Sequence, residues 1–211
     1  YCGAVYHVMA RGNHGQPIFK DDKDRERFME TLAEACEKTG WRIYAYVLMS
    51  NHYHLLLQAP AESPSEAETI ERYTAFHQGR RTLRPGSRAC RAWQARMRDV
   101  SWCMRHLQHL YSIWYNHSRP IRRRGPLWAG RFKNTVLEDG AALWACWTYI
   151  ELNPVRASMV QHPAEYPWSS YRANAQGEAS DLVTLHPLYT ALGGDPEARQ
   201  AAYRALFRDE L

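Results

Sequence analysis

The chain has 211 residues with 45% hydrophobic content, enough to bury the core of one domain. No apolar run approaches the roughly 20 residues of a membrane-spanning helix, and no signal peptide opens the sequence, so we expect a cytoplasmic protein. The five cysteines are scattered and form no CxxC pair, which argues against a disulfide framework or a zinc knuckle and favours free thiols.

Positive charge is concentrated in one quarter of the chain. Residues 79–133 hold 14 lysines and arginines and one acid, Asp99, whereas the rest holds 13 basic and 21 acidic residues. This segregation is typical of a surface that binds a polyanion. A solvated helix is the alternative reading, but arginine dominates the segment and its forked guanidinium suits phosphate.

In chain order, the sequence predicts a strand, a helix, a hairpin, a helix, a strand and a helix. β-Branched and aromatic residues predict the strands at 4–10, 41–48, 52–58 and 132–137. Helical spacing of apolar residues predicts helices at 22–39, about 92–116, 140–152 and about 197–207. Residues 59–68 and 122–126 resemble loops. We therefore expect an α+β fold with helices packed on a mainly antiparallel sheet, in a strand order that the sequence leaves open.

Two histidines occur two residues apart on the third predicted strand. Side chains alternate across a strand, so His52 and His54 share one face while Tyr53, between them, takes the other. Two imidazoles on one face can converge on one metal ion. By itself, however, an HxH pair is a weak signal.

A second pair lies at the end of the helix at 140–152. Tyr149 and Asn153 are four residues apart and therefore share one helix face. A core tyrosine with a local hydrogen bond is the common explanation for such a pair.

Five blocks taken together are more specific. The blocks are MARGN (9–13), MSNHYHLLL (49–57), GPLWAGRFK (125–133), YIELNPVRA (149–157) and YPWSSYR (166–172). They resemble the REP-associated tyrosine transposases, single-tyrosine members of the HUH endonuclease superfamily that are related to insertion-sequence transposases. The blocks occur in the family's order from the start of the chain to about Arg172.

The resemblance implies a fold, a site and a cofactor. The fold would be ferredoxin-like (RRM-like), and residues 1–172 would form the HUH domain, followed by a tail at 173–211 with a short helix. His52 and His54 match the paired metal ligands, Tyr149 the catalytic tyrosine, and Asn153 a polar residue that helps complete the metal site. The ion would be Mg²⁺ or Mn²⁺, although the sequence does not exclude Zn²⁺. The chain has about 30 residues more than a compact member of the family, at 61–91, and we interpret them as an insertion.

The expected partner is single-stranded DNA that carries a hairpin of the repetitive extragenic palindromic type. Candidate backbone contacts are basic, Trp128 is a candidate for stacking on an unpaired base, and Arg11 and Asn13 are candidates for reading bases. The basic candidates are Arg122, Arg123, Arg124, Arg131 and Lys133.

A metal-dependent endonuclease and strand transferase, acting through a 5′-phosphotyrosine intermediate, is therefore the expected function. We expect it to be monomeric, nucleoid-associated and without a membrane partner. A non-catalytic binding module and a metal hydrolase that uses water are the alternatives. Tyr115 is the rival nucleophile, with Tyr111 on the same helix, and His106 with His109 could imitate a metal pair.

Overall fold

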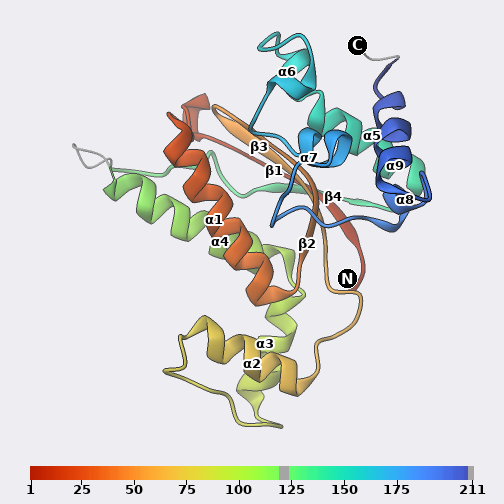
Figure 1. The fold of residues 1–211 in the computed structure, drawn as a ribbon. Helices are drawn as coiled ribbons and strands as arrows, with labels where there is room; N and C mark the ends of the chain where they lie inside the picture. The colour runs from red at the N-terminus through yellow and green to blue at the C-terminus, as the bar shows by residue number, and fades with distance from the viewer. Residues whose placement is uncertain (119–123, 209–211) are drawn as a thin grey trace. The chain divides into compact units, whose positions relative to one another are not determined.

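The computed structural model describes residues 1–118 and 124–208 (Figure 1), and the chain divides into two compact units. The first unit comprises Tyr1–Ala4, Glu26–Arg42 and Gln58–Pro126, and the second comprises Val5–Arg25, Ile43–Leu57 and Leu127–Leu211. No helix in the described part of the chain is both long and apolar enough to cross a membrane.

The second unit is built around an antiparallel sheet. Within the described residues its strands, in the order β2-β3-β1-β4, are β1 (Val5–Arg11), β2 (Arg42–Met49), β3 (His52–Gln58) and β4 (Lys133–Leu137). β1 pairs with β4, with Val5 opposite Leu137 and Met9 opposite Lys133. The predicted α+β fold is therefore confirmed, and the strand order places β1 beside β3 at the centre of the sheet.

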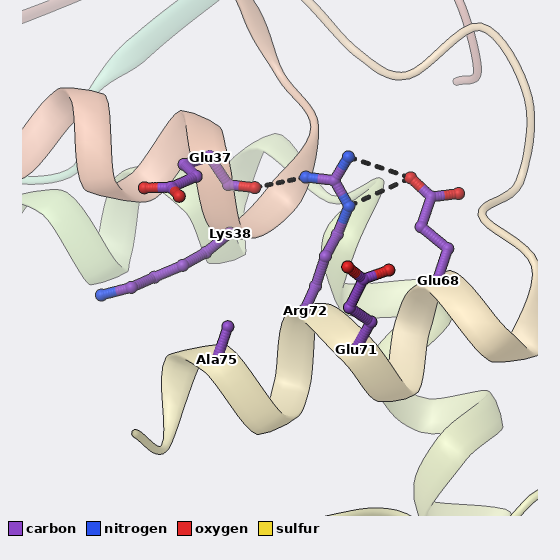
Figure 2. Close-up of a pocket in the computed structure, with 6 residues that line it drawn as sticks. All are labelled: Glu37, Lys38, Glu68, Glu71, Arg72 and Ala75. Carbon is purple, nitrogen blue, oxygen red and sulfur yellow. Dashed lines mark hydrogen bonds and ion pairs between the residues drawn. The ribbon is translucent and has the colours of Figure 1, made fainter. Parts of the chain in front are cut away.

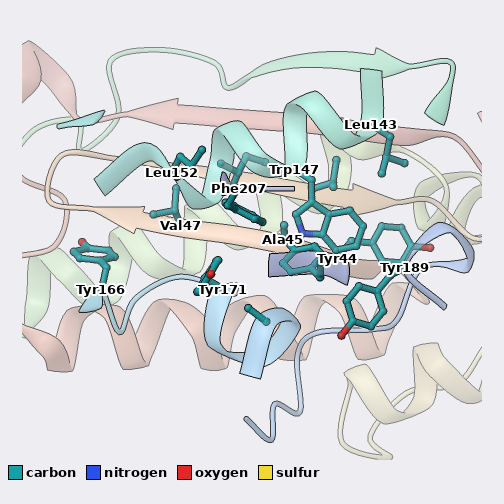
Figure 3. Packing of buried hydrophobic residues seen from close by; sticks show 14 of the residues in the cluster. Tyr44, Ala45, Val47, Leu143, Trp147, Leu152, Tyr166, Tyr171, Tyr189 and Phe207 are labelled. Carbon is teal, nitrogen blue, oxygen red and sulfur yellow. The ribbon is translucent and has the colours of Figure 1, made fainter. Parts of the chain in front are cut away.

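Helix α5 (Gly140–Glu151) packs its apolar residues against the sheet. Figure 3 shows Trp147 of α5 close to Tyr44 and Ala45 of β2, and the rings of Tyr44 and Trp147 stack 6.1 Å apart. Leu143 of α5 belongs to the same cluster. Three later helices contribute to the same cluster: α7 (Tyr171–Gln176), α8 (Pro187–Thr190) and α9 (Pro196–Ala205). The C-terminal segment is thus part of the core of this unit.

The same segment covers the outer edge of β2. The backbone N–H of Leu48 donates to the carbonyl of Trp168 at 2.9 Å, and that of Thr184 donates to Ile43 at 2.7 Å. The hydroxyl of Tyr166 donates to the carbonyl of Leu48 at 2.7 Å. These bonds satisfy backbone groups that an open sheet edge would leave unpaired.

A buried carboxyl group ties α5 to this segment. Glu151 is fully buried and accepts hydrogen bonds from Ser170 Oγ at 2.5 Å, Asn174 Nδ2 at 2.9 Å and the Tyr203 hydroxyl at 2.7 Å. Burial raises the pKa of Glu151 to about 7, although these hydrogen bonds act in the opposite direction.

The first unit is mainly helical. It contains most of α1 (Asp22–Thr39) together with α2 (Glu66–Phe76), α3 (Arg88–Met97) and α4 (Val100–His117). Phe28 of α1 meets Tyr111 of α4 edge to face, with ring centroids 5.2 Å apart. Arg72 of α2 contacts Glu68 and the backbone carbonyl of Glu37 in α1, in a cleft that Figure 2 shows.

Two expectations for residues 59–116 are wrong. The expected loop at 59–68 contains the start of α2, because Ser65 caps the helix by accepting from the N–H of Glu68 at 3.1 Å. The single helix expected at about 92–116 is two helices, α3 and α4. The break occurs because Asp99 accepts from the N–H of Ser101 at 2.7 Å and so begins a new helix.

Shorter elements complete the chain. They are η1 (Asn13–Gly15), α6 (Asn153–Arg156) and η2 (Pro163–Glu165). The five cysteines are free; Cys90 and Cys103 are buried, as expected of structural thiols, whereas Cys2 is exposed. The division into a domain at 1–172, an insertion at about 61–91 and a tail at 173–211 stays a prediction.

The burial of Glu151 predicts an unusual pH dependence of stability. Because its folded pKa lies above the ordinary 4.5, the folded protein binds more protons than the unfolded chain from pH 4.5 to 7. Stability from this group is therefore present at low pH and lost as pH rises through about 7. Relative to Glu151→Gln, which mimics the protonated acid, the wild-type free energy of unfolding should fall by about 3 kcal/mol across this interval.

Urea denaturation of both proteins across this interval measures the difference. All other ionisable groups are common to both proteins, so their contribution cancels in the comparison. If the free energies of unfolding of the two proteins change in parallel from pH 4.5 to 7, the raised pKa of Glu151 is contradicted.

Candidate functional site

The two histidines of β3 lie together, as strand alternation predicts. The ring centroids of His52 and His54 are 5.2 Å apart, and His54 is almost fully buried, with 3% of its surface exposed. Tyr53, on the opposite face, is buried against Trp128, with ring centroids 5.8 Å apart. The apolar face fixes the strand in the core and leaves the imidazoles on the other face.

A third histidine, which sequence reasoning missed, approaches from the neighbouring strand. His7 of β1 has its Nε2 atom 2.8 Å from Nδ1 of His54, and the two rings stack 5.1 Å apart at 18°. The available signal was a lone polar residue in the apolar strand AVYHVMA. The pairing itself depends on β1 lying beside β3, which the sequence does not reveal.

Tyr149 reaches this cluster from the last turn of α5. Its ring lies edge-on to His54 at 5.5 Å and to His7 at 6.3 Å, and 38% of its surface is exposed. The guanidinium of Arg156 lies 5.3 Å from the Tyr149 ring. Sequence reasoning also missed Arg156, although the spacing of seven residues from Tyr149 equals two helical turns.

Asn153, at the start of α6, approaches the side chain of His52. Oδ1 of Asn51 lies 2.7 Å from Nδ1 of the same imidazole. Both proposed histidine ligands therefore have a polar neighbour at Nδ1, since His7 occupies the same position on His54.

The electrostatics favour neutral imidazoles. Burial, followed by the charges of His7 and His52, lowers the pKa of His54 to about 3. Burial also lowers the pKa of His52, the nearby Asn153 acts in the opposite direction, and the charge of Arg11 lowers this pKa further. Burial lowers the pKa of His7 as well. A neutral imidazole keeps the lone pair that a metal ion requires.

The donor set fits a divalent ion that accepts nitrogen and oxygen ligands. Two neutral imidazoles and the Asn153 carboxamide are the available groups, and imidazole and carbonyl donors suit Mn²⁺ among other ions. In residues 1–118 and 124–208 no group of three or more His, Cys, Asp and Glu side chains is arranged to hold a metal ion.

Backbone hydrogen bonds bring the MARGN segment to the β2–β3 turn. The N–H of Gly12 donates to Asn51 at 2.8 Å, and the N–H of Asn13 donates to Leu127 at 2.8 Å. A Cβ atom on Gly12 would lie 2.0 Å from the carbonyl oxygen of Gln16, so glycine is needed for this tight return. Arg11 and Asn13 are thus held near His52, and Trp128 pairs with Gly12 in an isolated bridge.

The predicted DNA contacts belong to both units of the chain. Arg11, Arg131 and Lys133 of the second unit are exposed, whereas Trp128 is half-buried against Tyr53. Arg124 is exposed and belongs to the first unit. Arg122 and Arg123 lie outside the described residues.

The alternative tyrosines and histidines on α4 are not arranged like Tyr149 and the histidines of β3. Tyr111 and Tyr115 are 0% and 1% exposed, so their phenol groups are enclosed within the first unit. His106 stacks on Trp102 with ring centroids 5.6 Å apart, and His109 is exposed.

Comparisons with known proteins agree with this architecture. Residues 2–77 match the family described as "Transposase IS200 like". A solved structure described as "Structure of the REP associates tyrosine transposase bound to a REP hairpin" matches with a TM-score of 0.57 and 14% identity, over 88% of each chain. No curated protein matches the chain. The expected likeness in fold to a REP-associated tyrosine transposase is confirmed, and at 14% identity this likeness shows the fold alone.

The burial of His54 predicts that its ring stays neutral in mildly acidic solution. Its pKa of about 3 lies well below the ordinary 6.5, so His54 takes up no proton as the pH falls from 8 to about 5. An NMR titration of the ring Cε1–H signal, identified by its loss in His54→Gln, measures this. A titration midpoint near 6.5 would show that the described surroundings of His54 are incorrect.

Proposed function

We propose that this chain, which resembles IS200-like transposases, cuts and rejoins single-stranded DNA with Tyr149 as the nucleophile. The observation that carries the proposal is the position of one exposed phenol beside paired histidines. The Tyr149 ring is 38% exposed and 5.5 Å from the ring of His54. The family match over residues 2–77, which include His52 and His54 but not Tyr149, supports a transposase-like activity in general.

His52, His54 and Asn153 are the residues that would hold a divalent cation, for which we propose Mg²⁺ or Mn²⁺. When bound, the cation supplies positive charge to a non-bridging phosphate oxygen, which offsets the repulsion that protects a phosphodiester from nucleophiles. The neutral state of both imidazoles suits this role. The exposed face of Tyr149 leaves room for a DNA strand to approach.

Tyr149 would carry out the covalent step. Its phenol loses a proton to solvent, its oxygen bonds to phosphorus, and the bond from phosphorus to the 3′ oxygen breaks. The departing oxygen takes up a proton and becomes a 3′-hydroxyl, while the 5′ phosphate stays on the tyrosine. A 3′-hydroxyl can later attack this phosphotyrosine and rejoin the strand without ATP, because the phosphoester bond is retained.

Positive side chains around Tyr149 would bind the phosphate backbone. Arg156 lies over the Tyr149 ring, where attack on phosphorus develops negative charge. Arg11, held beside the β2–β3 turn, and the exposed Arg131 and Lys133 are further candidates. We propose that Asn13 reads bases and that Trp128 stacks on an unpaired base.

A hairpin-bearing strand is the proposed substrate. The solved structure of similar fold is described as bound to a REP hairpin, and we extend that class of DNA to this chain as a proposal. The concentration of arginine and lysine in residues 79–133 supports a polyanionic partner. We propose a monomer as the acting form.

Two alternatives make different predictions. A metal hydrolase would use water and cleave DNA without a protein–DNA adduct. A binding module would retain the hairpin and leave it intact. The exposure of Tyr149 beside His54 favours the tyrosine mechanism over both.

A denaturing-gel assay with Tyr149→Phe tests the proposal. A hairpin-bearing single strand, labelled on a phosphate 3′ of the cut, is incubated with Mn²⁺ and protein. Wild type should form a protease-sensitive adduct that requires the metal, and Tyr149→Phe should abolish it because phenylalanine has no nucleophilic oxygen. Tyr115→Phe, checked for folding by circular dichroism, is the matched control and should keep the adduct, since Tyr115 is buried.

Cleavage without an adduct, unchanged in Tyr149→Phe, would favour the water-using hydrolase. Retention of the hairpin without cleavage, across a panel of hairpin sequences, would favour the binding module. An adduct lost in Tyr115→Phe but kept in Tyr149→Phe would show that Tyr115, and not Tyr149, is the nucleophile.

A further inference from the structure

Hydrogen bonds around Asn51 define which nitrogen of His52 is available. The amide Nδ2 of Asn51 donates to the backbone carbonyl of Gly15 at 3.2 Å. A carbonyl only accepts, so this bond fixes the amide orientation and turns Oδ1 toward Nδ1 of His52, 2.7 Å away. Because an amide oxygen also only accepts, Nδ1 of His52 carries the proton. The lone pair of His52 is therefore on Nε2.

His54 has the same nitrogen engaged, but its partner is another imidazole. Nδ1 of His54 is 2.8 Å from Nε2 of His7, and the near-parallel rings are 5.1 Å apart. One proton lies between these two nitrogens, and either ring can carry it. If His54 carries it, the lone pair of His54 is on Nε2, as in His52. If His7 carries it, Nδ1 of His54 accepts this hydrogen bond, and the proton of the neutral His54 ring is on Nε2.

We propose that His7 is a positioning residue that accepts the Nδ1–H of His54 and thereby presents Nε2 of His54 to the divalent cation. Asn51 does the same for His52, so each histidine has one outer partner that fixes its tautomer and ring orientation. His7 itself is then protonated on Nδ1. The inference deepens the proposed function and rests on its assignment of His52 and His54 as ligands.

The fold explains why this partner is available. β1 lies next to β3 in the sheet, which brings His7 beside His54 although they are 47 residues apart in sequence. Both rings lie near the exposed Tyr149, with His54 the closer of the two. His7 is half-buried and contacts the more deeply buried His54 directly, so it would act on the cation through His54.

Manganese binding without DNA tests the inference. In His7→Leu, which removes the acceptor, the affinity for Mn²⁺ measured by electron paramagnetic resonance should fall by about 10- to 100-fold. His7→Gln should restore most of it, because its side-chain oxygen can accept at the place of Nε2. Thr135→Val is the matched control: Thr135 lies opposite His7 on β4, is exposed, and is expected to leave affinity unchanged.

Wild-type affinity in His7→Leu would overturn the inference, as would a His7→Gln protein no better than His7→Leu. A long-range ¹H–¹⁵N spectrum of the metal-free wild type keeps the inference testable even if His7→Leu fails to fold. It should show His54 protonated on Nδ1, and protonation on Nε2 would overturn the inference. These readouts need no DNA cleavage, so failure of the Tyr149 adduct assay is distinguishable from failure here.

Discussion

Side-chain alternation along β3 is the constraint on which the site depends. The strand places Tyr53 in the core against Trp128, and the same period turns His52 and His54 to the other face. Leu56 continues that face into the cluster packed against α5. Because a strand cannot rotate one residue alone, burial of its apolar residues holds the two imidazoles in register with the helix that carries Tyr149.

The orientation of the proposed nucleophile, Tyr149, depends on contacts made by the opposite side of its helix. Tyr149 and Glu151 are about 200° apart around α5, so exposure of one accompanies burial of the other. Glu151 is held by Ser170, Asn174 and Tyr203, which belong to later segments of the chain. The C-terminal segment therefore acts on the proposed chemistry at a distance, by fixing the rotation and position of α5.

Local patterns predicted the four strands and the helices α1, α5 and α9, because alternation, helical spacing and caps depend on neighbouring residues. The sequence also placed Tyr149 and Asn153 four residues apart, and their chain positions bring both close to the histidines of β3. The sequence did not predict the role of His7, because its contact with His54 depends on strand order. It also did not predict the helix break at Asp99, where an N-cap interrupts continuous helical spacing. The Glu151 network was equally hidden, since its partners are 19 to 52 residues away.

The central claim is that His52, His54 and Asn153 form one cation site beside Tyr149. Anomalous diffraction from crystals of the protein soaked in Mn²⁺ tests this claim directly. The account predicts a peak within about 2.0–2.4 Å of Nε2 on both histidines, on the side that faces Tyr149. A peak at His106 and His109 with none between His52 and His54, in a protein that forms the adduct, would contradict it.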